Sequence, residues 1–423
     1  MSIAASFLAG AKSRLLPADI PFRFFVACTV LHVLMWLALL LAAGQATSFR
    51  GGLGPALAAV HLLTLGVLTT AAIGASAQLL PVATRRALVA VWPLKLTFWL
   101  VVPGLIGLVL AMAAVSTALL VAAALATTAG LLLFAAVTAD NLRRAGSLPV
   151  VAAYGWAALA ALVAVVGLGL ALSLNYETGW LPDHSAAALA HMLLGGFGFM
   201  GLLVLGFSHV LVPMFALSAA PAKTTSRLGF VLAVLAVALG SAGALADSRE
   251  VLAAAALLGL AAAALHIRLM QQALAGGMRK RLGLSFVLIR LAWALLALTL
   301  IVGLAALYGL AGPNGATLFG FLLIGGWLLT FLLGILQRIV PFLASMHMGR
   351  SAAGGPLMSE IAGSQPLKLH AACHVLALAL VAAGIAGDAV WLVRLGSAAG
   401  LAGALAYGWF MAGVARRVAV RDP

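Results

Sequence analysis

The stretch AHMLLGGFGFMGLLVLGFSHVLVPMF, residues 190–215, is a long apolar run with a histidine near each end and a proline soon after the second histidine. It is long enough to cross a bilayer as a helix, which takes about 20 residues. An imidazole at membrane depth is costly unless it faces the protein interior and has a partner there. His191 and His209 therefore raise the question of what they bind.

Apolar runs of this kind recur along the whole chain. Of the 423 residues, 65% are hydrophobic and 8% are charged, which excludes an ordinary soluble domain. The sequence predicts an all-α polytopic membrane protein whose 12 spanning helices lie near residues 23–44, 56–80, 90–113, 116–139, 149–172, 186–217, 227–246, 250–271, 286–310, 316–345, 367–387 and 389–414. Residues 1–22 and 416–423 are predicted cytoplasmic tails, and residues 23–415 form one transmembrane domain.

The net charge of +15 reports orientation and not a nucleic-acid partner. Under this topology only Arg50, Arg249 and Arg394 of the 24 basic residues fall on one side. This bias follows the positive-inside rule and places both termini in the cytoplasm. The two cysteines, Cys28 and Cys373, lie inside predicted spans, where a structural disulfide is not expected.

Two other predicted spans share the pattern of residues 190–215. Gln78 precedes Pro81 and Gln337 precedes Pro341, as His209 precedes Pro213, and the three prolines are 132 and 128 residues apart. The sequence therefore predicts three pseudo-threefold units of four helices, roughly 23–145, 149–275 and 285–415, with the second, sixth and tenth helices lining the centre. The alternative is that Gly-rich apolar helices resemble each other by composition alone.

A pseudo-threefold set of 12 helices resembles subunit I of the heme–copper oxidase superfamily. HLLTLGVL at 61–68 and AQLLPVATRRALVAVWPLKLTFWL at 77–100 are similar to that family's second helix and the turn after it. LQRIVPFLASMHMGR at 336–350 resembles the NnrS-like and other divergent oxidase-like proteins of bacteria. The resemblance implies that His61, which matches a family histidine, ligates a low-spin heme.

The departures from that family are as informative as the resemblance. The position expected for a copper-ligating histidine on the sixth helix is Val204, and no tyrosine follows it. The adjacent copper histidines expected between the seventh and eighth helices are missing from the sequence. Phe319 and Phe321 stand where the tenth helix would carry its two heme histidines. These differences exclude an ordinary terminal oxidase or nitric oxide reductase.

His61 and His191 lie 20 and 22 residues before the prolines of their helices. At a rise of about 1.5 Å per residue they sit at nearly one depth, and Gly66 and the Gly195–Gly196 pair leave space beside them. We predict that they bind one heme b from both sides, as an electron carrier with no open axial position. The alternative is two buried histidines that hydrogen-bond to carbonyl or hydroxyl groups.

A second group of histidines and cysteines is expected at the cytoplasmic end. The i, i+4 spacing places His370 and His374 on one helix face and Cys28 and His32 on another. The resemblance implies that these two helices are neighbours. Imidazole and thiolate suit copper, zinc or iron, so the group predicts a metal such as copper, or a second heme. Interface and core packing is the alternative for this set of residues, which consists of Cys28, His32, His209, His347, His370, Cys373 and His374.

Three remaining polar residues are expected to have other roles. His266 lies two residues before Arg268 and is predicted to be interfacial, and His184 is predicted to be solvated in a loop. Arg338 is predicted either to pair with an anion such as a heme propionate or to reach the membrane surface.

The residues leave three functions open. The first is a heme-binding protein for electron transfer or for small-gas or metal handling, an oxidoreductase if it is an enzyme. The second is a transporter of copper or another small solute, and the third is an assembly subunit that lost its cofactors. Histidine and glutamine dominate the buried polar residues, which favours cofactor ligation over transport. The expected setting is the bacterial inner membrane, with lipid, a cytochrome or other redox subunit, or a second copy of the chain as partners.

Overall fold

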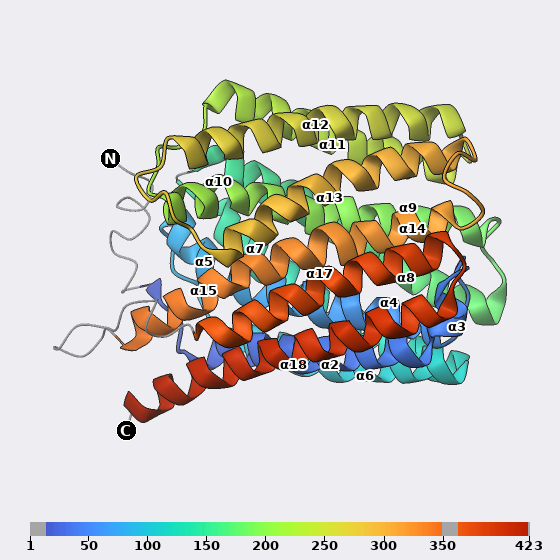
Figure 1. The fold of residues 1–423 in the computed structure, drawn as a ribbon, viewed down its shortest axis with the longest axis horizontal. Helices are drawn as coiled ribbons and strands as arrows, with labels where there is room; N and C mark the ends of the chain where they lie inside the picture. Colours follow the sequence, from blue (N-terminus) through green and yellow to red (C-terminus); the bar gives the residue numbers. More distant parts are fainter. Residues whose placement is uncertain (1–13, 147, 349–362, 422–423) are drawn as a thin grey trace.

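The computed structural model describes residues 14–146, 148–348 and 363–421, and in these ranges the chain forms helices and no strand. Twelve helical spans are long and apolar enough to cross a membrane, which confirms the prediction of an all-α polytopic membrane protein. They lie along one common direction in an elongated bundle (Figure 1). The predicted tails fall partly outside the described residues. Within those residues the first span begins at Asp19 and the last helix continues to Arg421, so both helices extend into the predicted tails.

The spans are of two kinds. The single helices are α2 (Asp19–Leu41), α6 (Trp92–Ala114), α7 (Thr117–Arg143), α8 (Pro149–Thr178), α11 (Lys223–Leu245), α12 (Arg249–Ala275), α13 (Leu284–Leu307), α17 (Ser364–Ala386) and α18 (Val390–Arg421). The composite spans join two α-helices through a π-helical segment and are α4 (Pro55–His61), η2 (Leu62–Thr69) and α5 (Thr70–Thr84); α9 (His184–Leu193), η3 (Leu194–Gly201) and α10 (Leu202–Ala216); and α14 (Gly315–Phe321), η4 (Leu322–Leu329) and α15 (Thr330–Met348). A short helix, α3 (Ala43–Ala46), follows α2.

The π-helical segments recur in register with the prolines. Each has eight residues, and each begins 19 residues before the proline of its own span, which is Pro81, Pro213 or Pro341. Where η2 meets α5, the hydroxyls of Thr69 and Thr70 donate to carbonyls five residues earlier, at 2.9 and 3.0 Å. π-helical turns are rare and are frequent at functional sites. Their matched positions support the prediction of three repeated units, which stays a prediction.

The composite spans form the centre of the bundle. Their most apolar windows are 72%, 89% and 72% buried inside the protein, whereas the corresponding windows of the single-helix spans are 28–44% buried. Small residues permit this close packing. At Gly201, for example, an added Cβ would lie 2.9 Å from the Trp327 ring of the next central span.

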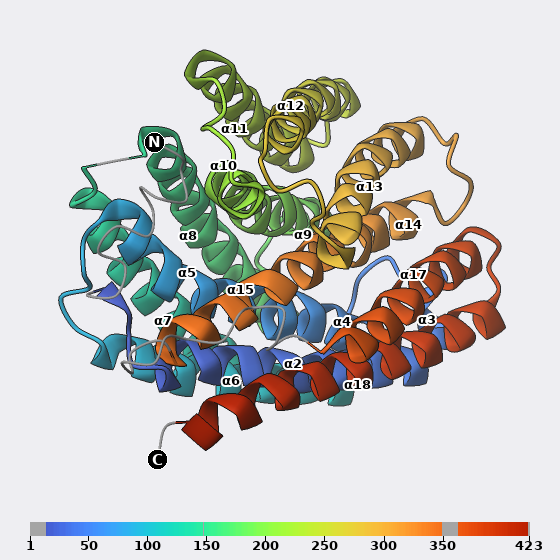
Figure 2. The ribbon, with the colours of Figure 1, turned by 60° about the vertical axis from the view of Figure 1, so that its left-hand side comes forward.

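The outer helices surround this centre in a repeating order. The pairs α6–α7, α11–α12 and α17–α18 pack as antiparallel hairpins. Each hairpin also packs against a further helix, in the pairs α7–α8, α12–α13 and α18–α2. The last of these contacts brings the C-terminal helix back to α2 and closes the ring, as Figure 2 shows from a second direction.

We call the end of the bundle where α2 begins and α18 ends the N/C end, and the opposite end the far end (Figure 1). The central spans run from the far end to the N/C end. Arginines gather where α5 and α7 end, and there Arg144 pairs with Asp140 at 2.5 Å while Arg86 donates to the Arg144 carbonyl at 2.9 Å. This distribution supports a cytoplasmic N/C end, which stays a prediction.

Candidate cofactor site

His61 and His191 come together toward the far end of two central spans. His61 is the last residue of α4, directly before η2, and His191 lies in α9 shortly before η3. Their ring centroids are 6.5 Å apart and the ring planes differ by 27°. The structure therefore places the two predicted heme ligands side by side on neighbouring helices.

Backbone carbonyls fix the protonation pattern of both rings. The Nδ1 atom of His61 lies 3.0 Å from the Leu57 carbonyl of its own helix, and the Nδ1 atom of His191 lies 3.0 Å from the Val165 carbonyl of α8. A carbonyl only accepts, so each neutral ring carries its proton on Nδ1 and donates it there. Each Nε2 atom then keeps a lone pair. This is the arrangement that metal-binding histidines use, with the second nitrogen orienting the ring.

The separation of the rings suits one metal ion between them. Two imidazoles on opposite sides of one ion, with metal–nitrogen bonds of about 2.0 Å, have ring centroids about 6.3 Å apart. The observed 6.5 Å is close to this value. Both histidines are half-buried although they belong to the most buried helices of the bundle. Neither residue is therefore fully enclosed by its neighbours.

Packing is looser in the far half of the central spans, and aromatic side chains lie there. Along α14 only Gly315 is buried, whereas every residue from Thr70 to Thr84 in α5 is buried. Phe197 stacks on Phe319 at 6.2 Å and contacts Trp327 at 5.7 Å. Aromatic and apolar side chains of this kind commonly line sites for small molecules. Comparison of the chain with protein-family models and with curated proteins finds no match.

A second set of histidines, the His370 cluster, lies at the seam between α2, α17 and α18. It consists of His32, His370, His374 and Tyr407, each at most 1% exposed. The His370 ring lies 6.3 Å from His32, 5.8 Å from His374 and 5.2 Å from Tyr407. Within the described ranges, His32 Nδ1, His370 Nε2, His374 Nδ1 and the Tyr407 hydroxyl have no hydrogen-bond partner. An unpartnered buried polar group costs about 1–3 kcal/mol. These four atoms are therefore available to hydrogen-bond a water molecule or to bind a ligand.

The hydrogen bonds of this cluster indicate whether a water molecule or a metal ion suits it better. Trp36 donates to His32 Nε2 at 3.0 Å, so the proton of neutral His32 sits on Nδ1. His370 Nδ1 lies 3.1 Å from the Gly403 carbonyl, which leaves a lone pair on Nε2. His374 Nε2 contacts the Thr330 hydroxyl at 2.8 Å. A donor on His32 beside an acceptor on His370 suits a bridging water better than a metal ion.

The remaining histidines predicted to join this group lie elsewhere. His209 contacts Tyr154 and His266 at 5.6 Å each, and His347 contacts Phe22 at 6.3 Å. Cys28 and Cys373 are both free thiols. Across the described parts of the chain, no three His, Cys, Asp or Glu side chains converge closely enough to hold a metal ion. The structure thus gives members of the predicted metal group different neighbours, because rotation about each helix axis points these side chains in different directions. Binding of a metal by this group stays a prediction.

His266 lies in the protein interior and not at the membrane interface beside Arg268, where the sequence predicts it. It is 3% exposed and packs on His209. The sequence does carry a signal for this, because His266 shares one face of α12 with apolar residues at helical spacing, all buried in the structure: Ala262, Ala263, Leu269, Met270 and Ala273. Arg268 points to another face, so its charge says nothing about its neighbour.

Two other predicted roles change in the structure. His184 is half-buried and contacts Asn175 at 2.9 Å, so it is tied to α8 and not freely solvated. Arg338 donates from Nε to the Ser285 hydroxyl at 2.8 Å and lies over the Phe286 ring at 6.0 Å. Its guanidinium is thus held near α13 by two contacts, and neither of them is with an anion or at the membrane surface.

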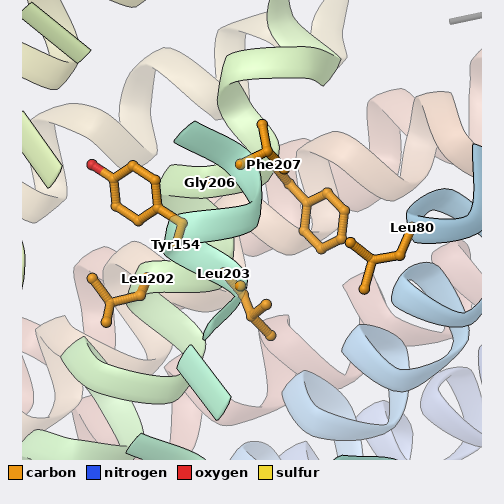
Figure 3. Close-up of a pocket in the computed structure, with 8 residues that line it drawn as sticks. Leu80, Tyr154, Leu202, Leu203, Gly206 and Phe207 are labelled. Atoms are coloured by element: carbon orange, nitrogen blue, oxygen red, sulfur yellow. The ribbon is translucent and has the colours of Figure 1, made fainter. Parts of the chain in front are cut away.

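A recess near Tyr154 is a packing feature and not a cofactor site (Figure 3). Its cavity volume is about 10 Å³, and it is lined by Leu80, Val151, Tyr154, Gly155, Leu202, Leu203, Gly206 and Phe207. Small-molecule sites usually measure about 300–1,000 Å³. The Tyr154 hydroxyl points away from Leu80 in this view, which leaves the recess with apolar walls.

Proposed function

We propose that this chain is a membrane cytochrome that holds one b-type heme between His61 and His191 and carries electrons. The observation that supports this most strongly is a pair of nearly parallel imidazoles, 6.5 Å apart, whose Nδ1 atoms are both occupied by backbone carbonyls. Free Nε2 lone pairs on two neighbouring central helices are the donor set that a bis-histidine heme requires. A heme held there would supply one-electron redox chemistry.

The chain's own residues would define the site in three ways. His61 and His191 would fill both axial positions, so no position stays open for a gaseous substrate. Phe197, Phe319 and Trp327 would provide the apolar contact surface. The Val165 and Leu57 carbonyls would hold the two rings in orientation and raise the basicity of each Nε2.

The proposal includes a scaffold like that of heme–copper oxidase subunit I and a place in the bacterial inner membrane. Three central spans with matched π-helical segments and prolines, enclosed by closed hairpins, support the scaffold. His61 and His191 lie six and seven residues from the far-end starts of α4 and α9, or about 10 Å along the helix axis. A cytochrome or another redox subunit would therefore exchange electrons at the far end.

The test is a visible absorption spectrum of the purified full-length protein in its oxidised and dithionite-reduced forms, with a pyridine hemochrome assay. We expect a Soret band and sharp reduced α and β bands, with the pyridine product of heme b. A pure, monodisperse protein without a Soret band, still without one after reconstitution with hemin, would overturn the proposal and favour the cofactor-free or transport alternatives.

A neighbouring glycine provides a second test that leaves both ligands in place. At Gly169 of α8 an added Cβ would lie 3.0 Å from His191 Cε1, whereas at Gly167 nothing lies within 4 Å. Gly169→Val is expected to push the His191 ring from its position and to lower heme affinity by roughly tenfold or more. Gly167→Val, two residues away on the same helix, is the matched control and should retain heme. Equal heme retention in the two variants, measured by hemin titration, would contradict the assigned position of His191.

A further inference from the structure

The proposed cytochrome role makes no use of a second pair of buried imidazoles. His209 of α10 and His266 of α12 are 6% and 3% exposed, and their ring centroids lie 5.6 Å apart at an angle of 60°. Within the described residues, His209 Nε2 and both ring nitrogens of His266 have no hydrogen-bond partner. A fully buried imidazole with neither nitrogen bonded is unusual, because buried polar atoms normally find partners.

The protonation pattern makes this pair a set of free ligands. His209 Nδ1 lies 2.9 Å from the Leu205 carbonyl, so its proton is there and Nε2 keeps a lone pair. His266 offers one lone pair in either tautomer, since no neighbour fixes its proton. The His370 cluster differs at this point, because the unpartnered nitrogen of His32 carries a proton. The α10–α12 pair thus presents two lone pairs with no hydrogen bond to break.

The ring separation fits ligation of one ion. With metal–nitrogen bonds of about 2.0–2.1 Å, two imidazoles on one ion have centroids about 5.1 Å apart at a tetrahedral angle and about 6.3 Å apart in a linear arrangement. The observed 5.6 Å lies between these limits and corresponds to a bent two-coordinate or trigonal site.

The surroundings select the kind of ion. The donors are neutral, and the buried polar side chains of the described residues include no Asp or Glu. A divalent ion would bury two uncompensated charges, whereas a monovalent ion buries one, at a much smaller desolvation cost. Met270 lies one turn beyond His266 on the same face of α12 and is 0% exposed, so this face also carries a buried thioether. Imidazole and thioether together favour Cu(I).

We propose that His209 and His266 form a binding site for Cu(I) between α10 and α12, separate from the heme site. Tyr154 of α8 also packs against His209, with ring centroids 5.6 Å apart at 33°. Phe230 packs edge-on against Tyr154 at 5.0 Å and closes the site toward α11. The ion would be held away from water, which protects the reduced state of copper from oxidation by solvent species.

The test uses the purified full-length chain, loaded with Cu(I) under ascorbate and equilibrated with the Cu(I) chelator bicinchoninate. Copper retained per chain is measured by mass spectrometry for the wild type, His209→Gln, His266→Gln and the control His184→Gln. We expect retention by the wild type and the control, and an affinity lower by roughly tenfold or more in the two site variants. Equal retention in all four proteins, or no retention in the wild type, overturns the proposal.

A second measurement needs no variant and covers the case that the substitutions impair folding. X-ray absorption at the copper edge of the loaded wild type is expected to show imidazole scattering from nitrogen at about 2.0 Å and a reduced, low-coordinate ion. A spectrum without imidazole scattering overturns the proposal. Because heme content is measured separately, loss of copper in His209→Gln with an unchanged Soret band also distinguishes this site from the heme site.

Discussion

His61→Ala and His191→Ala are each expected to abolish the Soret band of the purified protein. The two imidazole rings lie 6.5 Å apart, and each substitution removes one of the two proposed ligands. Phe197, Phe319 and Trp327 contribute no replacement ligand. Heme affinity should fall by at least tenfold, on the order of the loss seen when the environment of a metal ligand is disturbed. Hemin titration of the purified variants measures the effect.

The control for this prediction is His184→Ala, which removes an imidazole held by Asn175 outside the pair. It should keep the wild-type spectrum. His61→Gly provides a rescue experiment, because added imidazole can enter beside a half-buried position and restore the band. Retention of heme in both His61→Ala and His191→Ala would show that other residues hold the heme.

Gly400→Ala is expected to destabilise the protein by about 1–3 kcal/mol, the usual cost of overpacking. A Cβ at this position of α18 would overlap the Trp36 indole of α2. Trp36 is 1% exposed and donates to His32 at 3.0 Å, so the indole has no free direction in which to move. The substitution therefore acts on the contact that closes the ring of helices. The midpoint of unfolding in detergent, followed by intrinsic fluorescence, measures it.

Gly413→Ala is the matched control on the same helix, because nothing lies within 4 Å of its added Cβ. Exchange of glycine for alanine inside a helix is intrinsically favourable by up to about 1 kcal/mol, so this variant should be as stable as the wild type or more so. Pairing Gly400→Ala with Trp36→Leu should recover part of the loss, since the two residues are in contact. Equal shifts in the two glycine variants would refute the steric account.

The site was only partly predictable from the sequence, and particular residues show why. His61 and His191 could be matched in depth because each is counted from a proline on its own helix. Position along the spans likewise predicts that His209, His347 and His370 share the cytoplasmic end. It does not predict their separate contacts, which are with Tyr154, Phe22 and His32 respectively. Counting along a helix gives height but not the direction in which a side chain points relative to other helices.

The amino-acid sequence is enough to assign the membrane-spanning class, the 12 spans and the frame in which the three prolines recur. These are properties of one segment at a time, because the length of an apolar run has only to match the thickness of a bilayer. Three other features are visible only in the folded chain: the His191 proton is held by Val165 of α8, His266 is the neighbour of His209, and α18 closes against α2. Each of these depends on the rotation and crossing of separate helices. Close packing of small residues sets that rotation and crossing, and composition does not encode them.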